Sequence, residues 1–280
     1  MSADMLVTSG ATRLAAAGIE NARAEARLLL AHALGVTRDE TLSAPAVTPE
    51  QAAAFETFIV RRAAREPFAY ITGRKEFWSL PFAVGPGVLV PRPESETLIE
   101  QALAFYPGRP HGLDIADLGT GSGCLLIAAM REFPASLGLG LEASRDALAW
   151  ATRNGLAYNL SARAEMRLDR WDAAPDGAFD MVFCNPPYIP TADIAGLEPD
   201  VSRYEPLSAL DGGPDGLDAY RALGPVLARI LMPGGHAFVE LGAGQAPAMA
   251  GLFQPHGLEI RRIAPDLQGI PRCLVLARPR

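Results

Sequence analysis

The stretch Asp117-Leu118-Gly119-Thr120-Gly121-Ser122-Gly123 decides the fold. It follows an apolar segment that ends at Leu118 and precedes a helical pattern from Cys124 to Glu132. Glycine has no Cβ, so the chain can turn tightly and approach a ligand, while free amides at the start of the next helix face that ligand. A strand, a glycine loop and a helix in this order predict an α/β fold that binds a nucleotide-like molecule.

The spacing of the glycines and a distant acid narrow the ligand. Cys124 stands where the dinucleotide fingerprint G-x-G-x-x-G has its third glycine, which disfavours NAD. Glu142 ends the next apolar segment, where an acid can accept hydrogen bonds from both hydroxyls of a ribose. A nucleoside-bearing cofactor is therefore expected, the alternative being a purely structural glycine turn.

A second motif, Asn185-Pro186-Pro187-Tyr188, follows the apolar segment Phe179–Cys184. Its polar groups should emerge at the carboxyl end of a sheet, where open α/β folds bind ligands. An amide nitrogen is a weak nucleophile, so its attack on a sulfonium methyl group needs positioning and polarisation. The Asn185 side-chain oxygen and the Pro186 carbonyl can accept hydrogen bonds from the two N–H groups of such an amide.

The other residues of this motif have roles of their own. Prolines fix the direction of the accepting carbonyl, and Tyr188 can stack on a planar group. The alternative interpretation is a turn after a strand, because Asn-Pro-Pro is strong turn chemistry. The order of the two motifs favours methyl transfer to a planar amide or amine nitrogen.

The pattern around these motifs predicts two domains and a linker. Helical spacing over residues 12–66, shown by Ala24, Leu28, Leu29, Ala31 and Ala33, indicates a small helical domain. Thr48-Pro49-Glu50-Gln51 predicts the start of a helix that runs to about Arg65. Aromatic and β-branched residues broken by Gly and Pro predict a hairpin between Tyr70 and Pro93. The expected division is residues 1–68, 69–92 and 93–280.

The part after Pro93 alternates helical stretches with short apolar strands, which predicts a parallel sheet covered by helices. The expected strands are residues 114–118, 137–141, 181–184 and 237–241. Residues 258–278 predict two strands joined by a loop at 266–271, which we expect to form an antiparallel pair at the sheet edge.

Composition bounds the class of partner. A formal charge of −7 and a pI near 5.2 disfavour free nucleic acid as a ligand, because tight binders carry a basic surface. Five basic residues close in sequence leave open either a local basic patch or a solvated helix face: Arg61, Arg62, Arg65, Arg74 and Lys75. No apolar run is long enough to cross a bilayer, and residues 1–10 lack a signal-peptide pattern, so cytoplasmic residence is expected.

Three further residue types carry weaker signals. Cys124, Cys184 and Cys273 share no metal-ligand spacing and are interpreted as core thiols, and no metal site is expected. The histidines at positions 32, 111, 236 and 256 are scattered. Trp171 either lines an adenine pocket or fills a core.

Together these residues resemble the release factor glutamine methyltransferase family, also called HemK or PrmC. The resemblance covers nearly the whole chain, and the order of its motifs is specific. Besides the two motifs above it includes Tyr70-Ile71-Thr72-Gly73, Glu76-Phe77, Val90-Pro91-Arg92-Pro93-Glu94-Ser95-Glu96-Thr97, Tyr204-Glu205-Pro206, Gly212-Gly213, Asp215-Gly216-Leu217, Tyr220-Arg221, Glu240-Leu241-Gly242 and Gln245.

The resemblance implies a helical amino-terminal domain that docks substrate, a hairpin linker and a Rossmann-like class I methyltransferase domain of seven strands, the last antiparallel. It implies methyl transfer from S-adenosyl-L-methionine, leaving S-adenosyl-L-homocysteine, to N5 of the glutamine in the Gly-Gly-Gln loop of class 1 peptide chain release factors. Neither a membrane nor free nucleic acid is an expected partner, and a monomer is expected.

The family's site residues carry over by position. Asn185, Pro186, Pro187 and Tyr188 would hold the glutamine and form the catalytic site. The cofactor contacts would be Asp117, Leu118, Gly119, Thr120, Gly121, Glu142, Trp171 and Asn185.

Two positions depart from the family pattern. Glu142 is one methylene longer than the usual Asp, and Arg170 stands before Trp171 where Asp is common. Two other functions stay open: a nucleic-acid adenine N6 methyltransferase, which would act on a flipped base, and a non-catalytic nucleoside-binding adaptor on the same fold.

Overall fold

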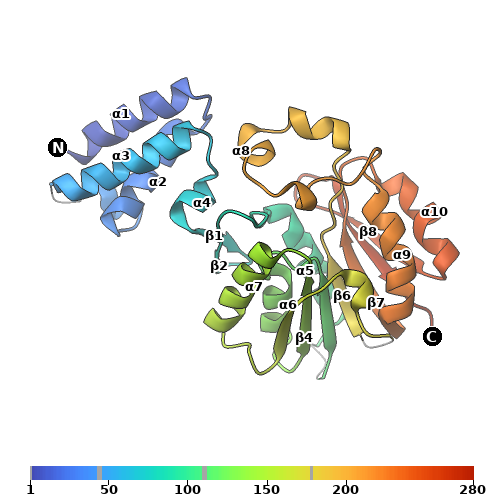
Figure 1. Ribbon diagram of the computed structural model, residues 1–280. Helices are drawn as coiled ribbons and strands as arrows, with labels where there is room; N and C mark the ends of the chain where they lie inside the picture. The colour runs from blue at the N-terminus through green and yellow to red at the C-terminus, as the bar shows by residue number, and fades with distance from the viewer. Residues whose placement is uncertain (1, 43–45, 109–111, 177–178) are drawn as a thin grey trace. The chain divides into compact units, whose positions relative to one another are not determined.

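The structure, a computed structural model, describes residues 2–42, 46–108, 112–176 and 179–280. The chain divides into two structural units (Figure 1). The helical unit comprises Met1–Arg74 together with Glu198–Tyr204, and the sheet unit comprises Lys75–Leu197 and Glu205–Arg280. His111, one of the scattered histidines, lies outside the described residues.

The helical unit is built from short helices around one apolar core. Its most buried side chains are Leu14, Leu29, Leu30, Phe55 and Ile59. Its elements are α1 (Ala3–Ala16), α2 (Ala22–Leu34), the 3₁₀ helix η1 (Glu40–Leu42), α3 (Pro49–Ala63), α4 (Phe68–Thr72) and α8 (Pro199–Ser202).

Helix α3 begins as its sequence predicts. The Thr48 hydroxyl accepts a hydrogen bond from the Gln51 amide, and the Gln51 side chain accepts one from the Thr48 amide. This reciprocal capping satisfies two amides that the first turn would otherwise leave unpaired. The helix ends at Ala63, two residues before the expected end.

Helix α2 is confirmed, but its buried face agrees only in part with the residues that predicted it. Leu29 and Ala31 are buried as predicted, whereas Ala24 and Leu28 are exposed and Ala22 and Ala26 are buried in addition. Alanine and leucine occur on several sides of this helix, so spacing alone did not fix which side faces the core.

A segment from late in the chain is fastened to the helical unit by ion pairs. Arg62, only 5 % exposed, contacts Glu25 at 2.5 Å and Asp200 at 2.7 Å. Arg65 contacts the other Asp200 oxygen at 2.6 Å and Glu198 at 2.6 Å. A buried guanidinium needs such partners because burial without them is costly. Residues 198–204 therefore pack with helices that precede them by more than a hundred positions.

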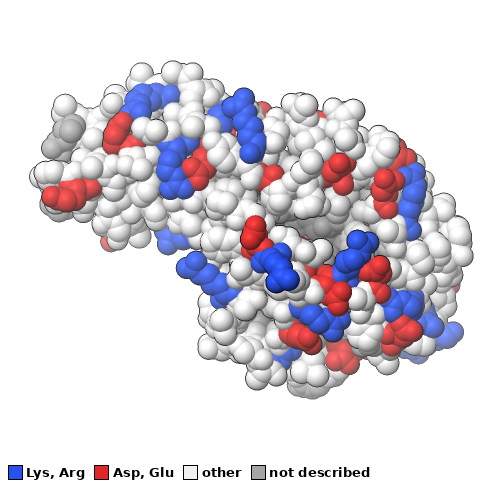
Figure 2. All heavy atoms as spheres, viewed as in Figure 1, with Lys and Arg blue, Asp and Glu red and all other residues white. Residues whose placement is uncertain are grey.

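Ion pairs bear on both interpretations of the basic cluster for three of its five residues. Arg62 and Arg65 are neutralised by acids, and Arg61 contacts Glu66 at 2.5 Å. Figure 2 shows basic and acidic side chains interspersed on the visible face. Neither a basic patch nor a simply solvated helix face describes these three arginines.

Among the described residues, no helix is both long and apolar enough to span a membrane.

The sheet unit contains a seven-stranded sheet in the order β5-β4-β3-β6-β7-β9-β8. Neighbours from β5 to β7 pair in parallel, whereas β9 is antiparallel to both β7 and β8. The predicted antiparallel pair is confirmed, with β8 at the edge. The strands are β3 (Asp114–Leu118), β4 (Leu137–Glu142), β5 (Ala164–Leu168), β6 (Phe179–Cys184), β7 (Leu231–Glu240), β8 (Glu259–Pro265) and β9 (Pro271–Ala277).

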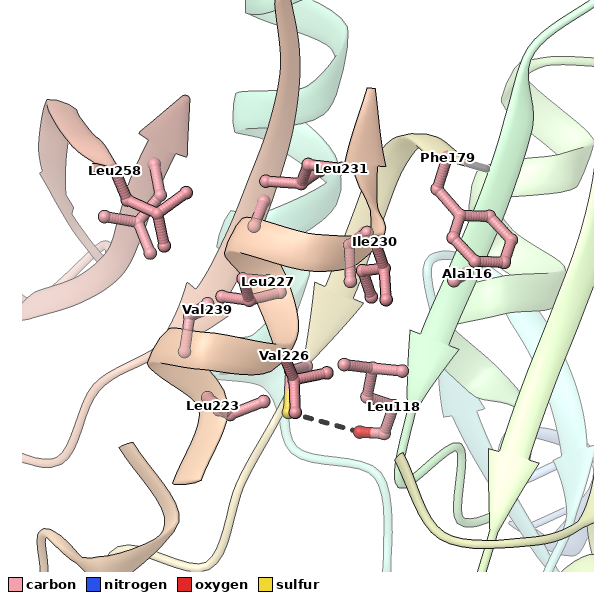
Figure 3. Packing of buried hydrophobic residues seen from close by; sticks show 14 of the residues in the cluster. Ala116, Leu118, Phe179, Leu223, Val226, Leu227, Ile230, Leu231, Val239 and Leu258 are labelled. Carbon is pink, nitrogen blue, oxygen red and sulfur yellow. Dashed lines mark hydrogen bonds between the residues drawn. The ribbon is translucent and has the colours of Figure 1, made fainter. Parts of the chain in front are cut away.

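Helices cover both faces of this sheet, because successive side chains of a strand point to opposite faces. Ile115 of β3 belongs to the apolar core that includes α5 and α6, whereas Ala116 and Leu118 belong to the core that includes α9 and α10. Figure 3 shows α9 packing Leu223, Val226, Leu227 and Ile230 in this second core. The main helices are α5 (Glu96–Phe105), α6 (Cys124–Glu132), α7 (Arg145–Ala157), α9 (Asp218–Ile230) and α10 (Met249–Phe253).

The predicted hairpin precedes this sheet and is shorter than expected. Strands β1 (Arg74–Phe77) and β2 (Leu80–Ala83) pair through a two-residue turn. Trp78 and Ser79 form the turn with φ of 53° and 57°, the left-handed conformation that tight hairpin turns require. Residues 70–72, which the sequence assigned to the hairpin, belong to helix α4.

Candidate active site

The glycine loop after β3 has the conformation that its sequence demands. Gly119, Gly121 and Gly123 have φ of 74°, 57° and 80°, and helix α6 starts at the next residue, Cys124. Other residues rarely adopt this left-handed region, so the three glycines are required by the backbone itself. The amides of Gly119 and Thr120 both donate to the Leu141 carbonyl, which anchors the loop to the end of β4.

Asp117 is buried behind this loop. Its side chain is 1 % exposed, and its Oδ2 accepts a hydrogen bond from the Thr120 hydroxyl at 2.6 Å. Burial raises the pKa of Asp117 to about 7. The Thr120 hydroxyl and the Leu126 backbone amide act in the opposite direction on this pKa. Oδ1, the second oxygen, makes no hydrogen bond of normal geometry to any described residue. A buried carboxylate oxygen without a donor is costly, which suits a site that receives a donor from a bound ligand.

Glu142 at the end of β4 closes the other side of the loop. Its Oε2 accepts from the Gly121 amide at 2.9 Å and its Oε1 accepts from the Ser144 amide at 2.9 Å. Both oxygens of Glu142, which is one methylene longer than the usual Asp, thus accept a hydrogen bond from a backbone amide. Each oxygen retains a second lone pair for a ligand hydroxyl.

One pocket opens at the carboxyl ends of β3, β4 and β6, as expected for this class of fold. It brings together eight of the residues predicted from the sequence: Leu118, Gly119, Thr120, Gly121, Glu142, Trp171, Asn185 and Pro187. Trp171, in the 3₁₀ helix η3 (Trp171–Ala173), lines this pocket and packs partly against the α9 core, while its contact with an adenine stays a prediction. An adjoining depression adds Asp169 and Arg170.

Several residues of the pocket wall carried no predicted role. Arg92 and Ser95 come from the chain before α5, and Pro206 and Ser208 from the chain after residue 204. Arg92 contacts the buried carboxylate of Glu205 at 2.5 Å. The signal for Arg92, Ser95 and Pro206 in the sequence was their place in the motifs that resemble a family, and Ser208 had no such signal.

Cys124 packs partly against the apolar core, as interpreted, but it also lies in the pocket wall. Burial raises its pKa to about 12, so the thiol is protonated near neutral pH. Cys184 and Cys273 are buried, and the Cys184 thiol contacts the Leu118 carbonyl at 3.2 Å (Figure 3). Within the described ranges, no three His, Cys, Asp or Glu side chains are grouped as metal ligands.

The motif Asn185–Tyr188 contains two neighbouring acceptors: the side chain of Asn185, which lines the pocket, and the carbonyl of Pro186, a buried residue that is not among the lining residues. The Asn185 Nδ2 donates to the Ser95 hydroxyl at 3.2 Å. None of the residues that the structure describes donates a hydrogen bond to Asn185 Oδ1 or to the Pro186 carbonyl. Two neighbouring acceptors without donors can bind the two N–H groups of a primary amide.

The last residue of the motif, Tyr188, is hydrogen-bonded to the buried carboxylate of Glu240. Tyr188 packs partly against the α9 core and donates its hydroxyl to Glu240 Oε1 at 3.2 Å. Ser95 donates to Glu240 Oε2. Burial raises the pKa of Glu240, while the hydrogen bond from Ser95, the charge of Arg272 and the hydrogen bond from Tyr188 act in the opposite direction.

The backbone at Pro187 and Tyr188 lies close to Gln245 and Gly212. Gln245 Nε2 donates to the Tyr188 carbonyl at 2.9 Å. A Cβ on Gly212 would lie 2.8 Å from the Tyr188 Cα and 2.9 Å from the Pro187 carbonyl oxygen. Glycine at position 212 is therefore required by this approach rather than by an unusual backbone angle.

A Rossmann-like methyltransferase domain is the class of protein that this sheet order, glycine loop and pocket define. The family model described as "Methyltransferase small domain" matches residues 97–195. A methyltransferase structure from Pyrococcus furiosus is similar in fold, with a TM-score of 0.50 and 16 % sequence identity over 80 % of this chain and 98 % of that chain.

The family is shown by relatives that span both units. The "PrmC N-terminal domain" model matches residues 6–73. The release factor glutamine methyltransferase of Rhodospirillum rubrum is 46 % identical over 275 residues, covering 98 % of this chain and 84 % of that protein. The protein of the same name from Caulobacter vibrioides is 43 % identical over 263 residues, covering 93 % and 91 %. The chain belongs to the release factor glutamine methyltransferase family, as its motifs indicated.

Proposed function

We propose that the protein transfers a methyl group from S-adenosyl-L-methionine to N5 of the glutamine in the Gly-Gly-Gln loop of a class 1 peptide chain release factor. The names of the relatives support this substrate. The observation that carries the reaction is a pair of neighbouring acceptors with no donor among the described residues: Oδ1 of Asn185, which lines the pocket, and the carbonyl of Pro186, the next residue in the chain. A primary amide presents two N–H groups that match them.

The same pair favours the chemistry. An amide lone pair is delocalised into its carbonyl, so the nitrogen attacks poorly unless it is held and polarised. Two acceptors on the N–H groups place the nitrogen and stabilise the positive charge that develops on it. The fixed φ of Pro186 and Pro187 restrains the accepting backbone, so little reorganisation is needed during transfer.

The cofactor site is proposed at the glycine loop. S-adenosyl-L-methionine, when bound, supplies the methyl group, and S-adenosyl-L-homocysteine is released. Glu142 has lone pairs for the ribose hydroxyls, and the donor-less Asp117 Oδ1 fits a ligand that carries an ammonium group. Leu118–Gly121, Trp171 and Asn185 complete the proposed contacts.

We assign substrate docking to the helical unit. The division 1–68, 69–92 and 93–280 stays a proposal for the family's domains, and residues 198–204 within the last range pack with the helical unit. The support for docking is that a separate family model covers the helical part. If docking lies there, a short peptide with the Gly-Gly-Gln loop should show a higher KM than an intact release factor at similar kcat. Residence in the cytoplasm and a monomeric state stay predictions from the sequence.

The test uses the protein with isotopically labelled S-adenosyl-L-methionine. Separate reactions would contain a bacterial release factor, its loop Gln→Ala variant, and single-stranded or duplex DNA, and mass spectrometry would locate the label. One methyl group on the loop glutamine, absent from the variant, is the expected result. Label on adenine would instead support the nucleic-acid enzyme, and cofactor binding without transfer would support the adaptor. Asn185→Ala should abolish nearly all transfer while cofactor binding is partly retained.

A further inference from the structure

We propose that Ser95 and Glu240 are positioning residues that set which way the Asn185 side-chain amide faces. The inference rests on the proposed function, because it concerns the atom of Asn185 that receives the substrate amide. It assigns roles to two residues outside the motif, one from the chain before α5 and one from the end of β7.

The orientation of an asparagine amide matters because its two ends are opposites. Oδ1 accepts hydrogen bonds and Nδ2 donates them, yet the two atoms have nearly the same size. An amide turned by half a rotation would present N–H groups to the substrate N–H groups and repel them. The pocket itself offers no described donor to Oδ1, so another contact must select the productive orientation.

Ser95 makes that selection only because its own hydrogen is engaged. A serine hydroxyl has one hydrogen to donate and lone pairs to accept. The Ser95 hydroxyl donates its hydrogen to Glu240 Oε2, so toward Asn185 it can only accept. Asn185 must then turn Nδ2 to Ser95, at 3.2 Å, which leaves Oδ1 free for substrate.

Glu240 fixes the direction of the whole chain of hydrogen bonds. Its side chain is 1 % exposed, and each carboxylate oxygen accepts from one hydroxyl, Ser95 on Oε2 and Tyr188 on Oε1. While this carboxylate is ionised it donates to neither, so both hydroxyls point toward it, as the two hydrogen bonds show. Asn185 and Tyr188, the two ends of the motif, are thus oriented by one buried carboxylate.

The experiment compares steady-state kinetics on an intact release factor, with the release factor concentration varied at saturating cofactor. Ser95→Ala removes the acceptor, and Glu240→Gln places a donor where only acceptors stood. Each should lower kcat about ten- to a hundredfold, while KM for the release factor changes less than about threefold. Ser136→Ala is the matched control, since Ser136 is 2 % exposed, its hydroxyl has no described partner and it lies outside the pocket wall. It should keep the original kcat.

A double variant separates positioning from simple structural support. If Ser95 acts through Asn185, Ser95→Ala should cost nothing further in the Asn185→Ala background. A further tenfold loss there, or an unchanged kcat for Ser95→Ala alone, would overturn the inference while the proposed function stands. Absence of glutamine methylation by the unaltered protein would overturn the proposed function, and this inference with it.

Discussion

The hydroxyl of Tyr188 donates a hydrogen bond to Oε1 of Glu240 at 3.2 Å, and that carboxylate is almost fully buried. The last residue of the Asn-Pro-Pro-Tyr motif is therefore held by its hydroxyl from inside the sheet unit. The two parts of Tyr188 therefore make different contacts. The ring packs partly against the α9 core, and the hydroxyl donates a hydrogen bond to the Glu240 carboxylate.

Tyr188→Phe should lower kcat about tenfold and leave cofactor affinity nearly unchanged. The ring stays, but one oxygen of a buried carboxylate loses its donor, which costs about 1.5–3 kcal/mol. Steady-state methylation and cofactor titration would measure both. Tyr158→Phe is the control, because that hydroxyl donates to the Pro81 carbonyl and lies outside the pocket wall. Equal losses in the two variants would argue against a specific role for the Tyr188 hydroxyl.

Asp117 should make the stability of the ligand-free protein depend on pH. Burial raises its pKa to about 7, against about 4 in an unfolded chain. Between these values the folded protein binds more protons than the unfolded one, so the free energy of unfolding falls as pH rises. Asp117→Asn removes this titration, and its Tm relative to the original should be at least about 3 °C higher at pH 8 than at pH 5.

Thermal unfolding without ligand at several pH values would check this prediction. A constant difference in Tm between Asp117→Asn and the original protein, from pH 5 to pH 8, would contradict it.

Gly212→Ala should damage catalysis through the backbone. The added Cβ would meet the Tyr188 Cα at 2.8 Å and the Pro187 and Gly216 carbonyl oxygens at 2.9 Å, none of which is the end of a flexible side chain. The motif must shift, and a displacement near 1 Å can cost about a hundredfold in rate. Gly196→Ala, where the Cβ has no neighbour within 4 Å, should be nearly neutral. Similar rates for both variants would sink the prediction.

Arg62→Ala should destabilise the helical unit by about 3 kcal/mol, because it leaves Glu25 without its cation and removes one of the two cations of Asp200, which keeps Arg65. Arg23→Ala, which breaks an exposed pair with Asp4, should cost less than about 1 kcal/mol. The three tryptophans, at positions 78, 150 and 171, all lie in the sheet unit. Urea unfolding followed by circular dichroism should therefore shift more than unfolding followed by tryptophan fluorescence. No shift in circular dichroism would refute the prediction.

Local patterns predicted much of the fold. The bounds of β3 and α6 agree with the sequence because an apolar strand, three glycines and a helix follow one another without ambiguity. Strand β5 (Ala164–Leu168) was missed, since an edge strand with Glu165 and Arg167 has no continuous apolar run. Residues 70–72 were misassigned because aromatic and β-branched residues favour strands only in the right context.

The residues of the candidate site also fall into two groups, those that local sequence predicted and those that it did not. Residues directly after a strand, such as Gly119 and Asn185, were found because the carboxyl ends of parallel strands share one edge. Ser95 and Glu240 had no predicted role because their contact joins positions 145 residues apart, and no local spacing reports such a pair. Their presence in motifs typical of the family was the only hint.

The helical unit is assembled from two separate pieces of chain, residues up to Arg74 and residues 198–204. Arg62 and Arg65 in the first piece need Glu198 and Asp200 in the second. A truncation that removes only the amino-terminal piece would therefore leave Glu198 and Asp200, which follow Asn185–Tyr188 in the chain, without their arginine partners. Exchange of this unit between relatives, in the laboratory or in evolution, has to move both pieces together, so the smallest inheritable module is discontinuous.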